Sequence, residues 1–410
     1  MNLYFILIAV FLVGSSLFDL IVELLNVASV SPEIPAEFAG YYDGEKYAAS
    51  QNYLKEKTLF SLIGDGFWLA VSLVFIYAGG FNFADRIARG FGFGEILTGL
   101  VFAGLLFFAS QPLRIPFSIY ETFVIEEKYG FNKTTPATFI ADLLKGWLLG
   151  LVLGGGIFAV ILWLFGSAGS AAWAWCALAV ILFQLFAAFI APVTILPLFN
   201  KFIPLDDGGL KESIEAYASS QSFALGGLYK MDGSRRSTKS NAFFTGFGRF
   251  RRIALFDTLI AGHTVEEIVS ILAHEIGHYK KRHILKSLAL SAVTTVLMFF
   301  ILSLFIGSRA LFDAFGMEYV SAYAGIVFFG FLYSPISMIL SVLTCAVSRT
   351  HEYEADRFAV ETYGRPDAFV DALKKLSVNN LSNLTPHRLK VIVEYTHPPV
   401  LERIKEIRSI

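Results

Sequence analysis

The sequence predicts a mainly α-helical, polytopic membrane protein with seven transmembrane helices. Two observations lead to this fold class: 55% of the residues are hydrophobic, and only 16% are charged. A soluble domain carries about 25% charged residues, so the composition argues against a purely soluble globule. The net charge of −1 leaves no basic surface for nucleic acid. The two cysteines, Cys176 and Cys345, both lie in apolar runs, which excludes a disulfide framework.

A helix needs roughly 20 apolar residues to cross a bilayer, and the uncharged runs give the spans in chain order. The first run has no preceding basic region and no small-residue cleavage pattern, so we expect a retained span and not a signal peptide. The longest run, 146–200, has 55 residues without an acidic or basic side chain. At ~1.5 Å per residue it would extend ~80 Å, so it must cross twice, with a turn at Gly166–Ser170. The expected spans are 1–27, 66–82, 96–113, two within 146–200, 287–308 and 319–348.

The distribution of Lys and Arg supports seven spans and gives their orientation. With this count, one side of the membrane holds 28 basic residues in four polar segments, 26–60, 114–137, 200–283 and the tail from 347. The opposite side holds only 3, which are Arg86, Arg89 and Arg309. The basic side should be cytoplasmic. We therefore expect an integral membrane protein of the endoplasmic reticulum or nuclear envelope in a eukaryote, or of the inner (cytoplasmic) membrane in a bacterium.

Four parts follow along the chain from this topology. Spans one to five with their loops occupy 1–199, and spans six and seven occupy 284–348. Two cytosolic segments remain, 200–283 and 349–410. The first of them begins with a polar helix-like stretch, Leu210 to Ser220. It then alternates as short strands around 226–231, 241–247 and 252–256, separated by turn sequences that include Gly246–Gly248, which predicts a small β-sheet.

A metal-binding motif lies near the end of the first cytosolic segment. Thr264 and Glu267 form a capping-box pattern, which predicts that a helix begins there. His274 and His278 are one helical turn apart and project from the same face, and Glu275 lies between them. In this HExxH pattern two imidazoles bind zinc, and the glutamate acts as a general base toward water. The sequence thus predicts one zinc ion per chain in a zincin-like catalytic domain on the cytosolic side.

A catalytic zinc ion takes three protein ligands and keeps one position open, so a further ligand is required. The metzincin form of the motif is excluded because Ile284 replaces its third histidine. Residues 276–312 contain no acidic side chain, so the third ligand must come from beyond the seventh span or from the luminal side. Glu352 and Asp356 are four residues apart on one helical face, on the same side of the membrane as His278. One carboxylate can bind the metal while the other orients an imidazole or assists proton transfer.

Charged neighbours place the zinc site at the membrane surface. Lys280, Lys281 and Arg282 directly follow the second histidine, and three cations at mid-bilayer would be costly. We therefore expect the zinc at the cytosolic interface, which argues against a site-2 protease. Glu354 and His351 are the alternative third ligands if Glu352 is not one. The histidines expected to be structural or on the surface are His263, His283, His351 and His387.

Over essentially its whole length the chain resembles the type I CAAX prenyl endopeptidases, a family of seven-span zinc membrane proteases. Besides the HExxH motif and the Glu352–Asp356 pair, five blocks of sequence carry the resemblance. They are Tyr120–Asn132, Pro192–Phe202, Ser240–Phe247, Ile253–Leu259 and Thr396–Pro399.

The resemblance implies a role for each matching residue. His274, His278 and Glu352 would bind zinc, Glu275 would be the catalytic base, and Asp356 would be a proton donor or an acid that supports a ligand. Three further residues would contact substrate: Asn241 and Ala242 along the edge of a strand, and His397 near the scissile carbonyl. The resemblance also implies a large water-filled chamber enclosed by the spans.

The expected partners are the lipid bilayer and a peptide or protein substrate, with or without a prenyl group. The family removes the C-terminal tripeptide that follows a prenylated cysteine. One alternative is an HtpX-type quality-control protease, which uses the same zinc site on misfolded membrane proteins but has a shorter chain with fewer spans. A non-catalytic channel or scaffold is the other alternative, and the intact Glu275 argues against it.

Overall fold

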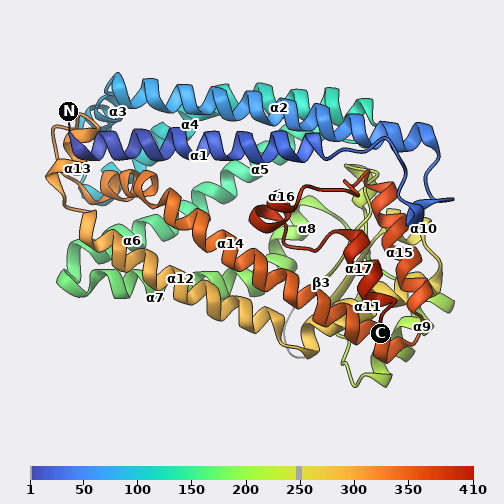
Figure 1. Cartoon of the computed structure of the whole chain (residues 1–410). Coiled ribbons are helices and arrows are strands. Elements are labelled where there is room, and N and C mark those ends of the chain that lie inside the picture. Colours follow the sequence, from blue (N-terminus) through green and yellow to red (C-terminus); the bar gives the residue numbers. More distant parts are fainter. Residues whose placement is uncertain (1, 246–251) are drawn as a thin grey trace.

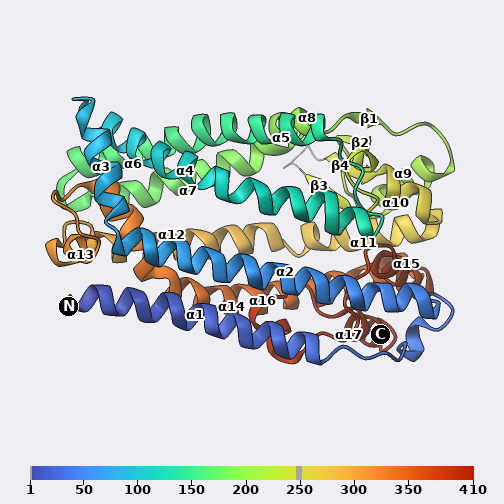
Figure 2. The same cartoon turned by 90° about the horizontal axis from the view of Figure 1, so that it is seen from above.

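The computed structural model describes residues 2–245 and 252–410 and contains two regions. Long helices run side by side through a membrane bundle, and a small sheet with several shorter helices gathers at one end of it (Figure 1). Seen from above, the N-terminus lies at the opposite end of the bundle from this sheet domain (Figure 2). The sheet domain comprises the four strands, α9–α11, α15–α17 and the last turns of α14.

Within the described chain, seven helical segments are long and apolar enough to cross a membrane, which confirms the predicted count. The 146–200 run crosses twice, and the chain reverses at Gly169, whose φ is +56°. The spans are α1 (Leu3–Ala28), α2 (Gly44–Tyr77), α4 (Glu95–Tyr120) with a π-helical turn to Glu126, α5 (Pro136–Leu149) with α6 (Gly155–Ser167), α7 (Ala172–Ile190) with α8 (Leu196–Phe199), α12 (His283–Phe305) and α14 (Ala322–Tyr363).

Two of these helices extend far beyond the apolar runs that predicted them. The second span was expected from residue 66, but α2 begins at Gly44, where the Asp43 side chain caps it by accepting a hydrogen bond from the Lys46 amide. The last span was expected to end at residue 348, but α14 continues to Tyr363. Hydropathy detects the lipid-facing part of a helix and not its ends, because polar turns outside the bilayer remain helical.

Two short helices lie at the end of the bundle away from the sheet domain (Figures 1 and 2). They are α3 (Gly80–Gly90) and α13 (Arg309–Ala314). The expected span over 66–82 overran the break before α3. Gly79 has a left-handed φ of +71° there, a conformation that glycine adopts without steric cost.

Among the described residues, the sheet has four strands in the order β1-β2-β4-β3. The predicted strands at 226–231 and 252–256 correspond to β2 (Gly227–Met231) and β4 (Arg252–Phe256), which pair in parallel. The predicted strand at 241–247 corresponds to β3 (Ala242–Thr245), antiparallel to β4. Residues 246 and 247 of that prediction, and the expected turn at Gly246–Gly248, lie outside the described residues. The short β1 (Phe202–Pro204) was not expected.

Six helices complete the sheet domain, and the HExxH motif lies on α11. They are α9 (Gly209–Ser220), α10 (Asp257–Gly262), α11 (Val265–Lys280), α15 (Pro366–Asn379), α16 (Arg388–Glu394) and α17 (Val400–Ile407). The predicted capping box is present at the start of α11. Thr264 Oγ1 accepts a hydrogen bond from the Glu267 amide at 3.3 Å, and the Glu267 carboxylate accepts one from the Thr264 amide at 3.1 Å.

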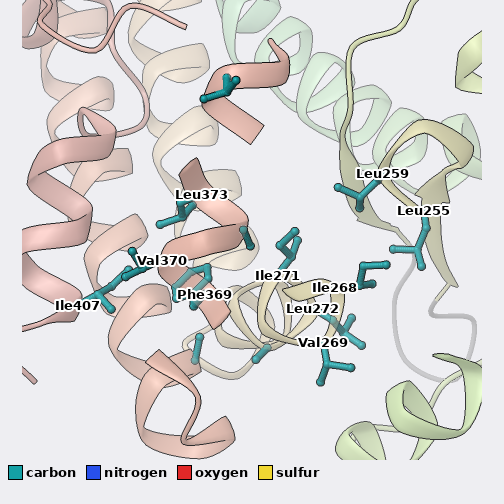
Figure 3. Packing of buried hydrophobic residues seen from close by; sticks show 14 of the residues in the cluster. Leu255, Leu259, Ile268, Val269, Ile271, Leu272, Phe369, Val370, Leu373 and Ile407 are labelled. Atoms are coloured by element: carbon teal, nitrogen blue, oxygen red, sulfur yellow. The ribbon is translucent and has the colours of Figure 1, made fainter. Parts of the chain in front are cut away.

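The core of the sheet domain surrounds α11. Figure 3 shows Ile268 and Leu272 of this helix between Leu255 of β4 on one side and Phe369 and Leu373 of α15 on the other. Fully burying one such side chain stabilises a fold by about 1.5–3 kcal/mol. The helix that carries the motif is therefore held by packing on both sides.

The two helices that carry the predicted metal ligands cross closely at Gly277. A Cβ atom at this position would lie 3.1 Å from both the Cα and the carbonyl oxygen of Ala355 on α14. A residue without a side chain is thus needed for α11 to approach α14 so closely. This crossing brings the motif face of α11 against the last turns of α14.

Candidate active site

Three side chains from two helices converge at this crossing. The Nε2 atoms of His274 and His278 are 3.0 Å apart. The Glu352 carboxylate faces both rings, with Oε2 at 3.4 Å from His274 Nε2 and Oε1 at 3.2 Å from His278 Nε2. One ligand atom from each of these residues lies within 4.8 Å of the others, so the group can hold one metal ion. The structure thus brings together the three residues that were expected to bind zinc.

Glu275 follows His274 on α11 and is half-buried beside the same group. Burial raises the pKa of its carboxyl group, whereas the neighbouring His274 and His278 lower it. A carboxylate in these surroundings is more basic than one in water, which is the property a general base needs.

Asp356 lies behind His274, and not in the group of three. The Asp356 Oδ1 atom is 2.7 Å from His274 Nδ1, on the opposite side of the ring from the cluster. Arg403 of α17 donates two hydrogen bonds to the same carboxylate, from Nε at 2.8 Å and from Nη2 at 2.6 Å. Burial disfavours the charge of Arg403, but Asp356 outweighs it, and the pKa of the guanidinium is raised. The Asp356–Arg403 pair fixes the orientation of the first imidazole.

A second chain of contacts supports the other imidazole. His278 Nδ1 lies 2.9 Å from His283 Nδ1, and His283 Nε2 lies 2.8 Å from Glu354 Oε2. The His283 ring is buried and stacks on His351 at a centroid distance of 4.1 Å. If His278 presents Nε2 to a metal, its Nδ1 proton is donated to His283, which in turn donates to Glu354.

Of the residues expected to contact substrate, His397 lies beside the cluster, and Asn241 and Ala242 lie at a strand that contacts α11. His397 Nε2 is 3.4 Å from Glu352 Oε1, and 65% of its side chain is exposed. Asn241 precedes β3, an outer strand that contacts α11. The Phe256 amide of β4 donates to the Asn241 carbonyl at 3.2 Å. Because main-chain groups alternate in direction along an antiparallel strand, those of Ala242 face away from β4.

The remaining histidines have structural contacts. His263 is buried, with Nδ1 at 3.1 Å from the Leu259 carbonyl. His387 caps α16 by accepting a hydrogen bond from the Leu389 amide at Nδ1. Neither contacts the cluster.

Two supporting residues were missed from the sequence. His283 was expected only as a structural or surface residue, because it is one position away from the metzincin register. Arg403 was not among the predicted site residues. One signal was available for it: Arg403 lies four residues before the buried Ile407, so it projects toward the apolar face of its helix.

These features define the class of the protein. An HExxH helix that meets a carboxylate at the end of a membrane-spanning helix, with Glu275 beside the ligand group, is the arrangement of an integral-membrane metallopeptidase.

Comparison with known proteins identifies the family. Residues 23–201 match a family model described as the CAAX prenyl protease N-terminal region with five membrane helices, and residues 204–410 match peptidase family M48. The chain belongs to family M48 and, within it, to the CAAX prenyl proteases, which confirms the resemblance found in the sequence.

Individual relatives match along nearly the whole chain. A probable CAAX prenyl protease 1 from Schizosaccharomyces pombe is 36% identical over 422 residues, which covers 98% of this chain and 88% of the relative. A CAAX prenyl protease 1 homolog from Homo sapiens is 31% identical over 445 residues, covering 94% of this chain and 90% of the relative. The crystal structure of S. mikatae Ste24p superposes with a TM-score of 0.94 at 32% identity and covers 99% of both chains.

Proposed function

We propose that this metallopeptidase is a zinc endopeptidase that removes the last three residues of prenylated CAAX proteins at the cytoplasmic membrane surface. The observation that carries the proposal is the His274–His278–Glu352 cluster, set at the end of a membrane-spanning helix. The names of its relatives, CAAX prenyl proteases in yeasts, plants and animals, support the choice of substrate.

The donor set suits a single zinc ion. Two imidazole nitrogens and one carboxylate oxygen are typical ligands of a catalytic zinc that keeps a fourth position open. Glu352 Oε2 is buried and accepts no hydrogen bond within the described chain, and Arg403 Nη1 forms only a long ion pair with it at 3.7 Å. A buried carboxylate oxygen without a hydrogen bond is costly, and a metal cation between the three side chains would satisfy it.

The division of work within the site follows from its contacts. A bound zinc ion supplies a Lewis acid that activates water and polarises the scissile carbonyl. Glu275 takes the proton of the attacking water on a carboxylate oxygen and delivers it to the leaving amine. Asp356 and Arg403 hold His274, and His283 and Glu354 hold His278, so that both Nε2 atoms keep their direction. Asp356 thus acts as an orienting acid, the second of the two roles that the resemblance implies.

Substrate contact is assigned to His397 and to the outer strand β3. The exposed His397 imidazole, beside Glu352, is placed to donate a hydrogen bond to the oxygen of the scissile carbonyl. An extended peptide can pair with the outward main-chain groups of Ala242. Without a peptide, the Ala242 amide donates a hydrogen bond to Asn241 Oδ1 at 2.8 Å.

Ala242→Pro removes this outward donor and should slow cleavage while metal content stays unchanged. Ala242→Val keeps the donor and is the control; equal rates for the two variants would contradict strand pairing.

The excess of Lys and Arg on the sheet-domain side supports a cytoplasmic active site. A cysteine introduced at position 207 or 400 should then react with an impermeant thiol reagent only from the cytosol. One introduced at position 168 or 310 should react only from the other side. Opposite sidedness of 207 and 400 would contradict the proposed topology.

The test of the substrate uses the purified full chain in detergent. A farnesylated CAAX peptide, its unmodified twin and an unfolded membrane protein are offered with and without a chelator, and zinc is measured by elemental analysis. We expect rapid cleavage of the farnesylated peptide, because burial of a large apolar group contributes at ~25 cal/mol per Å², and loss of cleavage with the chelator. Equal rates for both peptides would instead favour quality-control proteolysis by the same metal site.

A further inference from the structure

A polar pocket lies at the end of the bundle away from the metal site. Its volume is about 740 Å³. It lies between the end of α3, the start of α4 and the residues that lead into α14. Helix α3 lies at the end of the bundle that holds the N-terminus (Figures 1 and 2). The charged and aromatic side chains that line it include Arg86, Arg89, Glu95, Glu318, Tyr319 and Tyr323.

The Arg89 guanidinium is held by a hydrogen bond from its Nε atom, which leaves its two terminal amino groups available. Its Nε donates a hydrogen bond at 2.8 Å to Asp85, whose side chain is fully buried. Asp85 also accepts a hydrogen bond from Tyr323 Oη at 2.5 Å, and the Tyr319 ring lies 4.8 Å from the guanidinium carbon. Within the described chain no hydrogen bond uses the two terminal amino groups of Arg89. A guanidinium fixed in this way offers a planar fork that matches a phosphate group.

The pocket also contains an acidic group suited to a cation. Glu318 is paired with Arg86, whereas exposed Glu95, in the first turn of α4, forms no ion pair with any described residue. One arginine fork and one carboxylate therefore face the same space. A ligand that satisfies both carries a negative and a positive charge a few bonds apart.

The surroundings of the pocket are those of a bilayer surface. Two membrane-spanning segments begin at its wall, at Glu95 and at Ala322. Large apolar side chains nearby face outward: Phe93 is 49% exposed, Leu97 54% and Val320 43%. A tyrosine such as Tyr319 is typical of the level of lipid headgroups. A ligand with acyl chains could place them along these residues while its headgroup fills the pocket.

We propose that this pocket binds the headgroup of a zwitterionic phospholipid from the leaflet opposite the metal site, with the phosphate on Arg89 and the ammonium group on Glu95. The site is separate from the peptidase centre and does not depend on the function proposed for it. Phosphatidylethanolamine, with a compact ammonium group that can donate hydrogen bonds, fits the exposed Glu95 carboxylate.

Native mass spectrometry of the intact protein tests the proposal. The detergent-solubilised chain is titrated with phosphatidylethanolamine or phosphatidylglycerol of identical acyl chains. We expect the first lipid to bind about tenfold more tightly, the size of effect that one hydrogen bond between charged groups produces. Equal binding of the two lipids would overturn the proposal. A third arm uses water-soluble glycerophosphoethanolamine, and displacement of the lipid at a similar concentration would show that the ligand is a soluble zwitterion.

Two variants separate the two halves of the site. Glu95→Gln should abolish the preference for phosphatidylethanolamine and leave phosphatidylglycerol binding unchanged. Asp313→Asn, which removes an exposed acid at the same end of the bundle but outside the pocket lining, should keep the preference. If Glu95→Gln also keeps it, the assignment of the ammonium group is wrong.

Arg89→Lys keeps the positive charge beside Asp85 but removes the fork. It should weaken binding of both lipids by about tenfold. Arg114→Lys is the matched control, because Arg114 also stacks on an aromatic ring, that of Trp68 at 4.9 Å, and does not line the pocket. Unchanged lipid binding by Arg89→Lys would overturn the phosphate assignment. Peptidase activity retained in detergent shows that each variant is folded.

Discussion

The consecutive helices α11 and α12 show two ways of keeping a helix in place. In α11, ten of 16 residues are buried, including every position from Glu267 to His274. In α12, only four of 23 are buried, although most of its side chains are apolar. A helix in water must cover its apolar groups with protein, whereas lipid already solvates those of a membrane helix. Side-chain packing therefore fixes the helix that carries His274 and His278, whereas α12 belongs to the bundle and leaves most of its apolar side chains uncovered by protein.

The difference between α11 and α12 predicts that the catalytic chemistry depends on α11 and on the residues that pack against it. Glu275→Gln tests this prediction and has the largest expected effect. Loss of the general base should lower the turnover rate about 10³-fold, while metal content measured by elemental analysis stays unchanged. Glu266→Gln changes an exposed glutamate on the same helix and should leave the rate as it is. Normal hydrolysis by Glu275→Gln would remove this residue from the mechanism.

A pair of leucines tests the difference in packing directly. Leu272 of α11 is 2% exposed and Leu304 of α12 is 63% exposed. Leu272→Ala should lower the free energy of unfolding by about 3 kcal/mol because it leaves a cavity. Leu304 projects from the outside of the bundle, so Leu304→Ala should change the free energy of unfolding by less than about 1 kcal/mol. Thermal or denaturant unfolding in detergent measures both, and equal losses would contradict the comparison.

A pair of glycines tests the helix crossing. Gly277→Ala places a methyl group 3.1 Å from the main chain of α14, whereas Gly156→Ala in α6 meets no atom within 4 Å. Both substitutions gain the same helix propensity, so their difference isolates the contact. We expect Gly277→Ala to be less stable than Gly156→Ala by about 2 kcal/mol and to bind zinc more weakly. Identical stability and zinc affinity would show that the crossing can widen without cost.

His283 lies at the junction of the two helices and has the smallest expected effect. It is the first residue of α12, but its contacts belong to the metal site. His283→Leu should weaken zinc binding about tenfold, as is typical when a hydrogen-bond partner of a ligand is lost. His283→Gln can still accept and donate hydrogen bonds and should recover part of the affinity. A zinc titration that does not distinguish the two variants from the wild type would mean that His278 needs no such support.

The span count and two of the ligands could be predicted because each rests on a short-range signal: uncharged runs identify the spans, and HExxH identifies His274 and His278. Glu352 followed from the span count, because a chain that crosses the membrane twice after His278 returns to the same side. Arg403 lies 47 positions beyond Asp356, on a helix that only tertiary packing brings to it, so no local pattern pointed to the pair. No local pattern pointed to the short strand β1 either. Nor did one point to Phe38 and Tyr47, which pack into the core around α11 but belong to a segment that was expected only to be a loop.

The continuity of α14 has a consequence for the depth at which the enzyme works. Its first turn holds Tyr323 at the far pocket, and Glu352 follows 29 residues later on the same helix. At ~1.5 Å per residue the two are ~44 Å apart along the axis, compared with a hydrocarbon layer of ~30 Å. If the Tyr323 end of this helix lies at the far leaflet, as the proposed lipid site requires, the length of α14 sets the height of the Glu352 carboxylate above the near leaflet. Under the function proposed above, a thicker or thinner membrane then changes how far a lipid-anchored peptide must rise to reach this carboxylate.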